Sequence, residues 1–133
     1  MRLLYMLLAF SLWIGCAYAV EPDEILVATE IPIASSNQVF YFHELARRHG
    51  DYAVAGLAAV AKKQGDVLTD CAFTFFSIGA TPVMAIQAQK IVNGQAVNPD
   101  LITKAVSAAR SEIEAIADIT NSAEAKQHLI GVL

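Results

Sequence analysis

The chain has 133 residues, of which 56% are hydrophobic, with a formal net charge of −4 and a mean hydropathy of +0.47. This length allows one domain whose core needs no cross-links. Nine basic residues against thirteen acidic ones, without a basic patch, exclude an electrostatic surface for nucleic acid. The two cysteines, Cys16 and Cys71, and the three histidines lack the spacing of a disulfide framework or a metal site, so we predict no bound metal.

Residues 1–19 have the pattern of a signal peptide. Arg2 supplies a positive charge, residues 3–15 are apolar, and Ala17-Tyr18-Ala19 is a small-x-small cleavage pattern before Val20. The apolar run is shorter than the about 20 residues that a membrane span needs, so we expect no stable span in the mature chain. The chain therefore divides into a signal-like segment over residues 1–19, which is either cleaved or a start-site artefact, and a domain over residues 20–133. A true signal implies a periplasmic or secreted protein, and otherwise we expect a cytoplasmic one.

The first half of the domain is rich in β-branched and aromatic residues, which favours strands. The predicted strands are Ile25–Ile33, Val39–Leu45, Tyr52–Lys63 and Val67–Ile78. Between the last two, Gln64-Gly65-Asp66 predicts a short hairpin loop in which the glycine supplies a positive φ angle. Small residues recur in the third strand at Gly56, Ala58, Ala59 and Ala61, and we expect them to let a helix approach the sheet closely.

The second half predicts three helices. Thr81-Pro82 opens the first, over Val83–Val92, because the missing N–H of proline costs nothing in a first turn. Asn98-Pro99-Asp100 opens the second, whose apolar stripe follows helical spacing as far as Ala117. Asn121-Ser122 caps a third helix that begins at Ala123 and runs to the C-terminus. Strands followed by helices indicate a small α+β domain.

The residues contain no catalytic constellation of their own. Ser35-Ser36 has no neighbouring base, and the carboxylates of Glu112 and Glu114 are two positions apart on a helix, where they point in different directions. Gly79-Ala80-Thr81-Pro82 precedes a predicted helix but lacks the second glycine and the lysine of a phosphate loop. Whether the chain is an enzyme is therefore left open.

Three segments together resemble the C-terminal domain of the FAD-binding (medium) subunit of molybdenum hydroxylases, the xanthine dehydrogenase and aerobic carbon monoxide dehydrogenase family. These segments are YAVEPDEILVATEIPI (18–33), RRHGDYAVAGLAAVAKKQGDVLTDCAFTFFSIGATPVMA (47–85) and SAEAKQHLIGVL (122–133). Their order and spacing extend the resemblance over residues 18–133. It implies an antiparallel sheet of three to four strands packed against three helices.

The resemblance also implies a cofactor and partners. In this family the domain lies beside an FAD-binding region, and the loop that corresponds to residues 44–54 lies near the flavin ring. Arg47, Arg48, Asp51 and Tyr52 are therefore the predicted flavin-proximal residues, which would tune access and electrostatics rather than perform hydroxylation. The implied partners are an FAD-binding domain or chain and the molybdopterin and iron–sulfur subunits of the same complex.

The N-terminal region departs from the family pattern. Residues 1–17 stand in place of the glycine-rich segments that hold the FAD pyrophosphate. We therefore expect FAD only in the assembled complex and none bound by this chain alone. Two readings follow: a detached C-terminal domain that supports electron transfer in such an assembly, or an exported small α+β binding or interaction module without flavin. A truncated gene is a further explanation of the same departure.

Overall fold

The computed structural model describes residue 23, residue 25, residues 27–28 and residues 32–133. The predicted signal segment lies outside these residues. So does much of the strand predicted over residues 25–33, and its described positions, residues 25, 27, 28, 32 and 33, are not in a strand. The chain divides into two units, residues 1–34 and residues 35–133. The architecture that follows belongs to the second unit.

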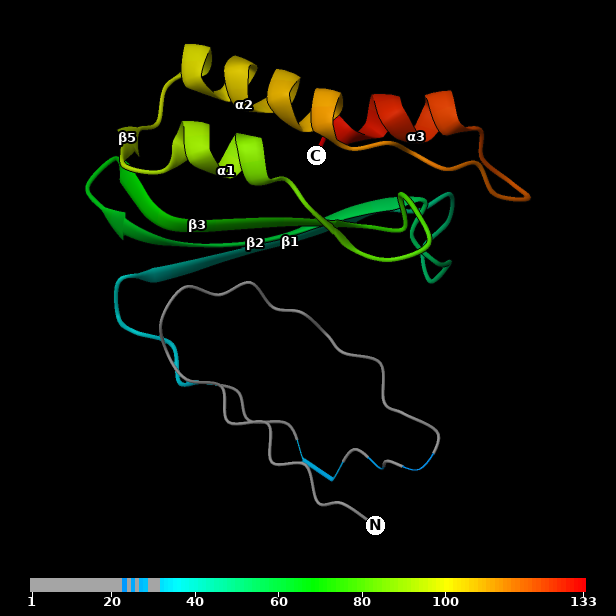
Figure 1. Cartoon of the computed structure of the whole chain (residues 1–133), viewed down its shortest axis with the longest axis horizontal. Coiled ribbons are helices and arrows are strands. Elements are labelled where there is room, and N and C mark those ends of the chain that lie inside the picture. The colour runs from blue at the N-terminus through cyan, green and yellow to red at the C-terminus, as the bar shows by residue number, and fades with distance from the viewer. Residues whose placement is uncertain (1–22, 24, 26, 29–31) are drawn as a thin grey trace. The chain divides into compact units, whose positions relative to one another are not determined.

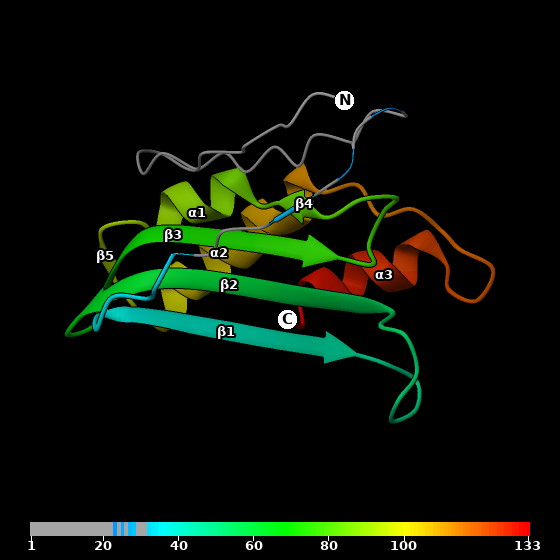
Figure 2. The ribbon, with the colours of Figure 1, turned by 90° about the horizontal axis from the view of Figure 1, so that it is seen from below.

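The second unit contains one antiparallel sheet, which confirms the predicted fold class. Its strands are β1 (Gln38–Leu45), β2 (Ala55–Gln64), β3 (Val67–Phe76), β4 (Val83–Met84) and β5 (Gln95–Ala96). The strands follow the order β1-β2-β3-β4, and β5 pairs with one end of β3. Three of the four predicted strands therefore form the body of the sheet, and two two-residue strands, which periodicity could not indicate, extend it (Figures 1 and 2).

A tight hairpin joins β2 to β3. Gln64 lies opposite Val67, so the loop consists of Gly65 and Asp66, and Gly65 has the predicted positive φ angle of 59°. Further along the ladder the register shifts by one residue at a bulge, where Asp70 has a φ angle of 50°. An extra residue reverses the alternation of side chains between the two faces of a strand. The bulge thereby allows Leu68 and Phe73 to line the same side of the sheet.

Helix α1 (Ile86–Val92) is shorter than predicted. The prediction that the helix begins at Val83 is wrong, because Val83 and Met84 pair with β3 as strand β4. The N-cap position of α1, Ala85, has no side-chain oxygen. The carboxylate of Glu112 supplies the cap instead: it accepts hydrogen bonds from the Gln87 N–H at 3.0 and 2.9 Å and from the Ala88 N–H at 3.2 Å. A carboxylate at the positive end of a helix is favourable, so this contact ties the end of α2 to the start of α1.

Helix α2 (Pro99–Glu112) begins as predicted, with the Asn98 side chain accepting from the Leu101 N–H at 2.9 Å. The predicted continuation of its apolar stripe to Ala117 is wrong, because residues 113–118 are not helical. In this segment Ile113 and Ala115 are buried, whereas Ile116 is exposed.

Helix α3 (Ala123–Ile130) begins at the predicted Ser122 cap, but the prediction that it runs to the C-terminus is wrong, because residues 131–133 are not helical. The Gln127 side chain holds the connection between α2 and α3: its Nε2 donates to the Arg110 and Ile113 carbonyls, at 2.6 and 3.1 Å.

The core lies between the sheet and the helices, which all cover one face of the sheet (Figure 1). Its buried members are Ala55, Phe75, Ile78, Ala85, Ala88, Ala109, Ile113, Ala115 and Ile130. Most of these residues are small, which lets α1 lie close to β3, while α2 packs mainly on α1 and α3 reaches the sheet at β2. None of the helices among the described residues has the length and apolar character of a membrane span.

Candidate functional site

The loop between β1 and β2 contains all four predicted site residues. Arg48 Nε and Asp51 Oδ2 are 3.2 Å apart, and the Asp51 N–H donates to the Arg48 carbonyl at 3.1 Å. Gly50, between them, has a φ angle of 86°, a conformation that side chains rarely adopt. The loop is thus a defined turn. Its exposed ion pair contributes only about 0–1 kcal/mol.

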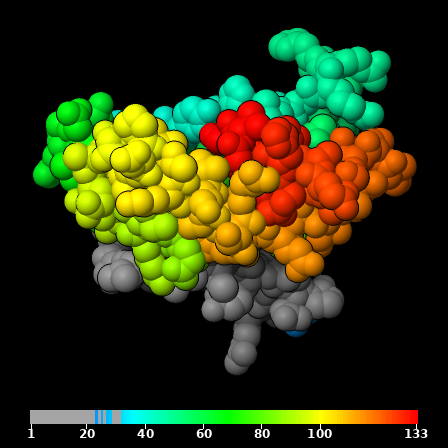
Figure 3. All heavy atoms as spheres, turned by 90° about the horizontal axis from the view of Figure 1, so that it is seen from above, coloured from blue at the N-terminus to red at the C-terminus, as the bar shows by residue number. Residues whose placement is uncertain are grey.

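The loop presents the other two predicted residues to solvent. Tyr52 is 99% exposed, and Arg47 is exposed as well. The space-filling view shows the residues that follow β1 as a projection from the body of the second unit (Figure 3). A fully exposed tyrosine is an amphipathic side chain of the kind that is enriched at interfaces. The geometry therefore fits a contact with another molecule better than a chemical step within this chain.

An aromatic surface lies on the sheet face that the helices leave uncovered, which we call the open face (Phe40, Phe42 and Phe76). Phe42 stacks on Phe76 with ring centroids 5.4 Å apart and an interplanar angle of 16°. The ring of Phe76 lies over Gly56, where any Cβ would overlap it. Phe40 and Phe42 each remain 66% exposed. This surface was not predicted, although the alternation in VFYFHEL, with Phe40 and Phe42 on one face of a strand, could have indicated it.

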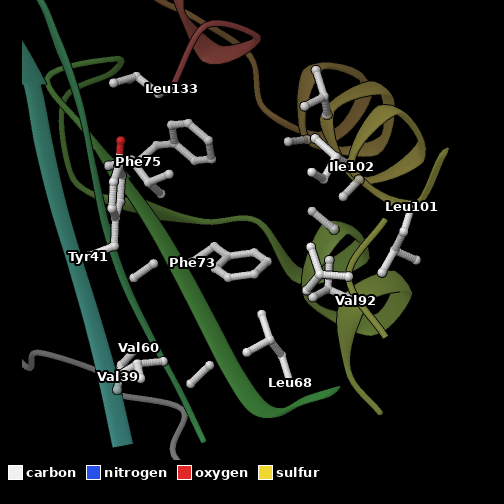
Figure 4. A pocket seen from close by; sticks show the side chains of 18 of the residues that line it. Val39, Tyr41, Val60, Leu68, Phe73, Phe75, Val92, Leu101, Ile102 and Leu133 are labelled. Atoms are coloured by element: carbon white, nitrogen blue, oxygen red, sulfur yellow. The ribbon is translucent and has the colours of Figure 1, made fainter. Parts of the chain in front are cut away.

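On the opposite face, an apolar groove of about 460 Å³ lies between the sheet and the helices (Figure 4). Tyr41 and Val39 line one side of it, and Ile102 and Leu101 line the other. The prediction that small residues of β2 admit a helix is therefore wrong over this part of the sheet. Ala59 and Ala61 line the groove instead, and no helix of the described residues fills it.

A buried lysine ties the end of β3 to α3. Lys126 is 5% exposed, and its Nζ lies 2.8 Å from Asp118 Oδ2 and 2.9 Å from the Ser77 carbonyl oxygen. Asp118 also accepts hydrogen bonds from the backbone N–H groups of Thr120 and Asn121. The ammonium of Lys126, followed by the backbone N–H of Thr120, holds the pKa of Asp118 well below its ordinary value. Every donor here has a structural partner, so this cluster stabilises the fold and is not a catalytic site.

The described residues fit part of a flavin site only. They contain no cluster of three or more His, Cys, Asp or Glu residues that could hold a metal. The segment Gly79-Ala80-Thr81-Pro82 leads into strand β4 and not into a helix, which makes the prediction of a helix N-terminus at this point wrong. The loop presents an exposed aromatic ring and an exposed guanidinium, but the described residues offer no glycine-rich turn at a helix N-terminus for a flavin pyrophosphate.

Comparison with known proteins identifies the family. Residues 40–133 match the CO dehydrogenase flavoprotein C-terminal domain, and the chain belongs to this family, the C-terminal domains of the FAD-binding subunits of molybdenum hydroxylases. It is 30% identical to the carbon monoxide dehydrogenase medium chain of Afipia carboxidovorans over 115 residues, which is 86% of this chain and 40% of that one. It is 27% identical to the glyceraldehyde dehydrogenase medium chain of Sulfolobus acidocaldarius, over 83% of this chain and 39% of that one.

Solved structures support the same assignment. Reconstituted CO dehydrogenase from Oligotropha carboxidovorans superposes with a TM-score of 0.69 at 27% identity, over 77% of this chain and 36% of that chain. Quinoline 2-oxidoreductase from Pseudomonas putida 86 gives a TM-score of 0.67 at 26% identity, over 77% and 35%. The resemblance inferred from the sequence is thus confirmed. The chain spans about 40% of the length of the curated relatives that it matches.

Proposed function

We propose that this chain acts as a detached C-terminal domain of an FAD-binding subunit in a molybdenum hydroxylase-type oxidoreductase. The observation that carries the proposal is the match over residues 40–133, which includes the loop that presents Arg47 and Tyr52. In this role the domain packs beside a separate FAD-binding domain or chain and supports electron transfer in the assembly. Molybdopterin and iron–sulfur subunits complete the complex. The hydroxylation itself belongs to those partners.

The loop and the open face are the parts of this chain that meet the flavin-binding partner. FAD, when bound in the assembly, supplies the redox chemistry. Tyr52 contributes an exposed aromatic ring that would shield the flavin from water, and Arg47 contributes a positive charge that no described acidic side chain neutralises. Arg48 and Asp51 neutralise one another and fix the turn. A positive charge near a flavin favours its anionic reduced form, so Arg47 would raise the flavin potential.

The experiment mixes the full chain with a separately expressed FAD-binding region from the same locus and records the flavin absorption spectrum. We expect the chain to shift the spectrum, because it replaces water around the ring. The variants Tyr52→Ala and Arg47→Ala should weaken the shift, and Lys104→Ala, on the exposed side of α2, is the matched control. A spectrum that the chain leaves unchanged would contradict the proposal.

The apolar groove supports a second candidate, a small binding module that works without flavin. Its lining is almost entirely apolar side chains from both the sheet and the helices. Such a site suits an apolar ligand, since apolar surface gains free energy when it leaves water. A rise in the fluorescence of an environment-sensitive apolar dye, abolished by Ala59→Phe in the groove and kept in a matched Ala58→Phe variant on the other face, would support this candidate.

A further inference from the structure

Strand β1 lies at the edge of the sheet. Within residues 32–133 it pairs with β2 on one side only, and Figure 2 shows it as the outermost strand of the sheet. Six of its eight residues are exposed. An edge strand of this length exposes a row of unpaired N–H and C=O groups, which is a template for another strand.

The pattern of hydrogen bonds shows which residues of β1 face the free edge. Gln38 lies opposite Lys62, and the Lys63 N–H donates to the Asn37 carbonyl at 2.8 Å. Asn37 and Lys63 are thus a hydrogen-bonded pair. The next pair along the ladder, Gln38 and Lys62, is therefore a non-hydrogen-bonded pair. Because the pairs alternate along an antiparallel ladder, the odd-numbered residues of β1 bond to β2. The backbone groups of the even-numbered residues therefore point away from the sheet.

Strand β1 carries little of the usual protection of an edge, since its only charged residue, Glu44, lies near its C-terminal end. The sequence of the strand, QVFYFHEL, contains neither lysine nor proline, the residues that most often block pairing at an edge. Aromatic side chains stand on both of its faces: Phe40 and Phe42 on the open face, and Tyr41, which stacks on His43 at 6.2 Å, on the helix side. The edge is thus long, apolar and unblocked in the part of the chain that the structure describes.

We propose that β1 is a self-association edge, at which a second copy of this chain adds its own β1 antiparallel to the first. A two-fold axis perpendicular to the sheet generates this pairing and keeps the helices of both copies on one face. The free groups of the even-numbered residues must then bond to one another. With the axis at Tyr41, Phe40 exchanges N–H and C=O bonds with Phe42 of the second copy, and each Tyr41 faces its counterpart in a non-hydrogen-bonded pair.

The side chains of β1 are complementary to themselves in this register. The opposed pairs are Phe40 with Phe42, Val39 with His43, and Gln38 with Glu44, each occurring twice about the axis. Aromatic residues meet aromatic residues, and the carboxylate of Glu44 meets an amide that can donate to it. A shift of the axis to Phe42 would place Glu44 opposite Phe40, and a shift to Phe40 would place Gln38 opposite Phe42. Both alternatives lose the polar pair, so the register centred on Tyr41 is favoured.

The register is tested by disulfide trapping of the full chain. In a background with Cys16→Ser and Cys71→Ser, the variant Tyr41→Cys places two thiols across the axis, where the Cα atoms of a non-hydrogen-bonded pair are about 4.5 Å apart. Mild oxidation should therefore convert most of this variant into a covalent dimer. Phe40→Cys is the matched control: its two copies lie two positions out of register and should remain largely monomeric. Equal trapping of both variants, or none of either, would overturn the proposal.

Sedimentation of the unmodified chain across a dilution series supplies a second test that needs no oxidant. We expect a reversible monomer–dimer equilibrium. Gln38→Arg, whose guanidinium faces the carboxylate of Glu44 of the second copy, should tighten the dimer, and Gln38→Glu should weaken it, with dissociation constants that differ by about tenfold at low salt. A chain that stays monomeric throughout, or two variants that bind alike, would contradict the pairing. Neither test depends on flavin, so the outcome is independent of the function proposed above.

Discussion

Gly56 supports the open face, and its replacement should reveal how tightly that face is packed. In the structure a Cβ at this position would overlap the ring of Phe76, which itself stacks on Phe42. The φ angle of Gly56 is not positive, so the backbone itself tolerates Gly56→Ala. The cost of this substitution is therefore the cost of moving a ring.

The magnitude follows from two terms. Insertion of one methyl group into a packed site costs about 1–3 kcal/mol. Displacement of the Phe76 ring also removes a stacked pair worth about 0.5–1.5 kcal/mol. Because alanine is itself the better strand residue by about 0.5–1 kcal/mol, and the Phe76 ring is only half-buried, we expect Gly56→Ala to lower the free energy of unfolding by about 1–3 kcal/mol. For a domain of this size, each kcal/mol lowers the Tm by about 4–8 °C.

The assay is urea denaturation of four proteins that form a double-mutant cycle: the unmodified chain, Gly56→Ala, Phe76→Ala and the double variant. Without the Phe76 ring, the added methyl group has room, and alanine is the better strand residue by about 0.5–1 kcal/mol. We therefore expect Gly56→Ala to destabilise the chain only when Phe76 is present. Equal effects in both backgrounds would show that the Phe76 ring is not the cause of the destabilisation.

Four further outcomes follow from the structure. Glu112→Gln should destabilise the chain by about 0.5–2 kcal/mol in thermal unfolding, because it removes the charged cap of α1, whereas Glu114→Gln should not. The lowered pKa of Asp118 means that its ion pair with Lys126 stabilises the fold above the unfolded pKa near 4 and loses this contribution as pH falls; Asp118→Asn should therefore flatten the acid limb of a stability–pH curve. Ala59→Leu should fill part of the groove, so urea denaturation should find the chain as stable as before or more stable by up to about 1 kcal/mol. A large loss of stability would show that the space beside Ala59 cannot accept a larger side chain. Mass spectrometry of the chain from its natural host should find Val20 at the N-terminus if residues 1–19 are a signal, and a chain that retains them would refute it.

The sequence predicted those elements that local signals determine. The hairpin at Gly65 and the start of α2 at Asn98 follow from turn and cap chemistry, which acts over two or three residues. The order of the three long strands and the three helices was also predicted, since these strands carry apolar runs and the starts of α2 and α3 carry caps, but the short strands β4 and β5 were not. The resemblance to the family then supplied the antiparallel pairing, which no local pattern contains.

The errors arise where tertiary contacts decide the structure. Val83 could not be recognised as a strand residue, because its extended conformation depends on pairing with Phe75 of β3 and not on a pattern in its own segment. The end of α2 at Glu112 was missed because the apolar pattern continues beyond it although the backbone there is not helical. The contact made at this end, between the Glu112 carboxylate and the first turn of α1, joins two helices and has no signal in the local sequence. The groove beside Ala59 likewise depends on where the helices stop, a property that small residues alone do not reveal.

The candidate site likewise has features that the sequence could predict and features that depend on the whole fold. Arg47, Arg48, Asp51 and Tyr52 are adjacent in sequence, so their location in one loop required only the strand boundaries. Their proximity to a flavin rests on the family and remains a prediction. The open face was overlooked, although Phe40 and Phe42 alternate along a predicted strand. The burial of Lys126 had no signal in the sequence, since its partners lie in segments whose placement depends on the whole fold.

In the assembly that we propose, FAD is held between this chain and a separate FAD-binding chain. The most direct measurement is FAD retention after gel filtration of the full chain, of the FAD-binding region from the same locus, and of their mixture. We expect FAD to elute with a complex of the two chains and to be lost from this chain by itself. Loss of FAD from the mixture, or elution of FAD with the FAD-binding region alone and not with a complex that contains this chain, would contradict the proposal.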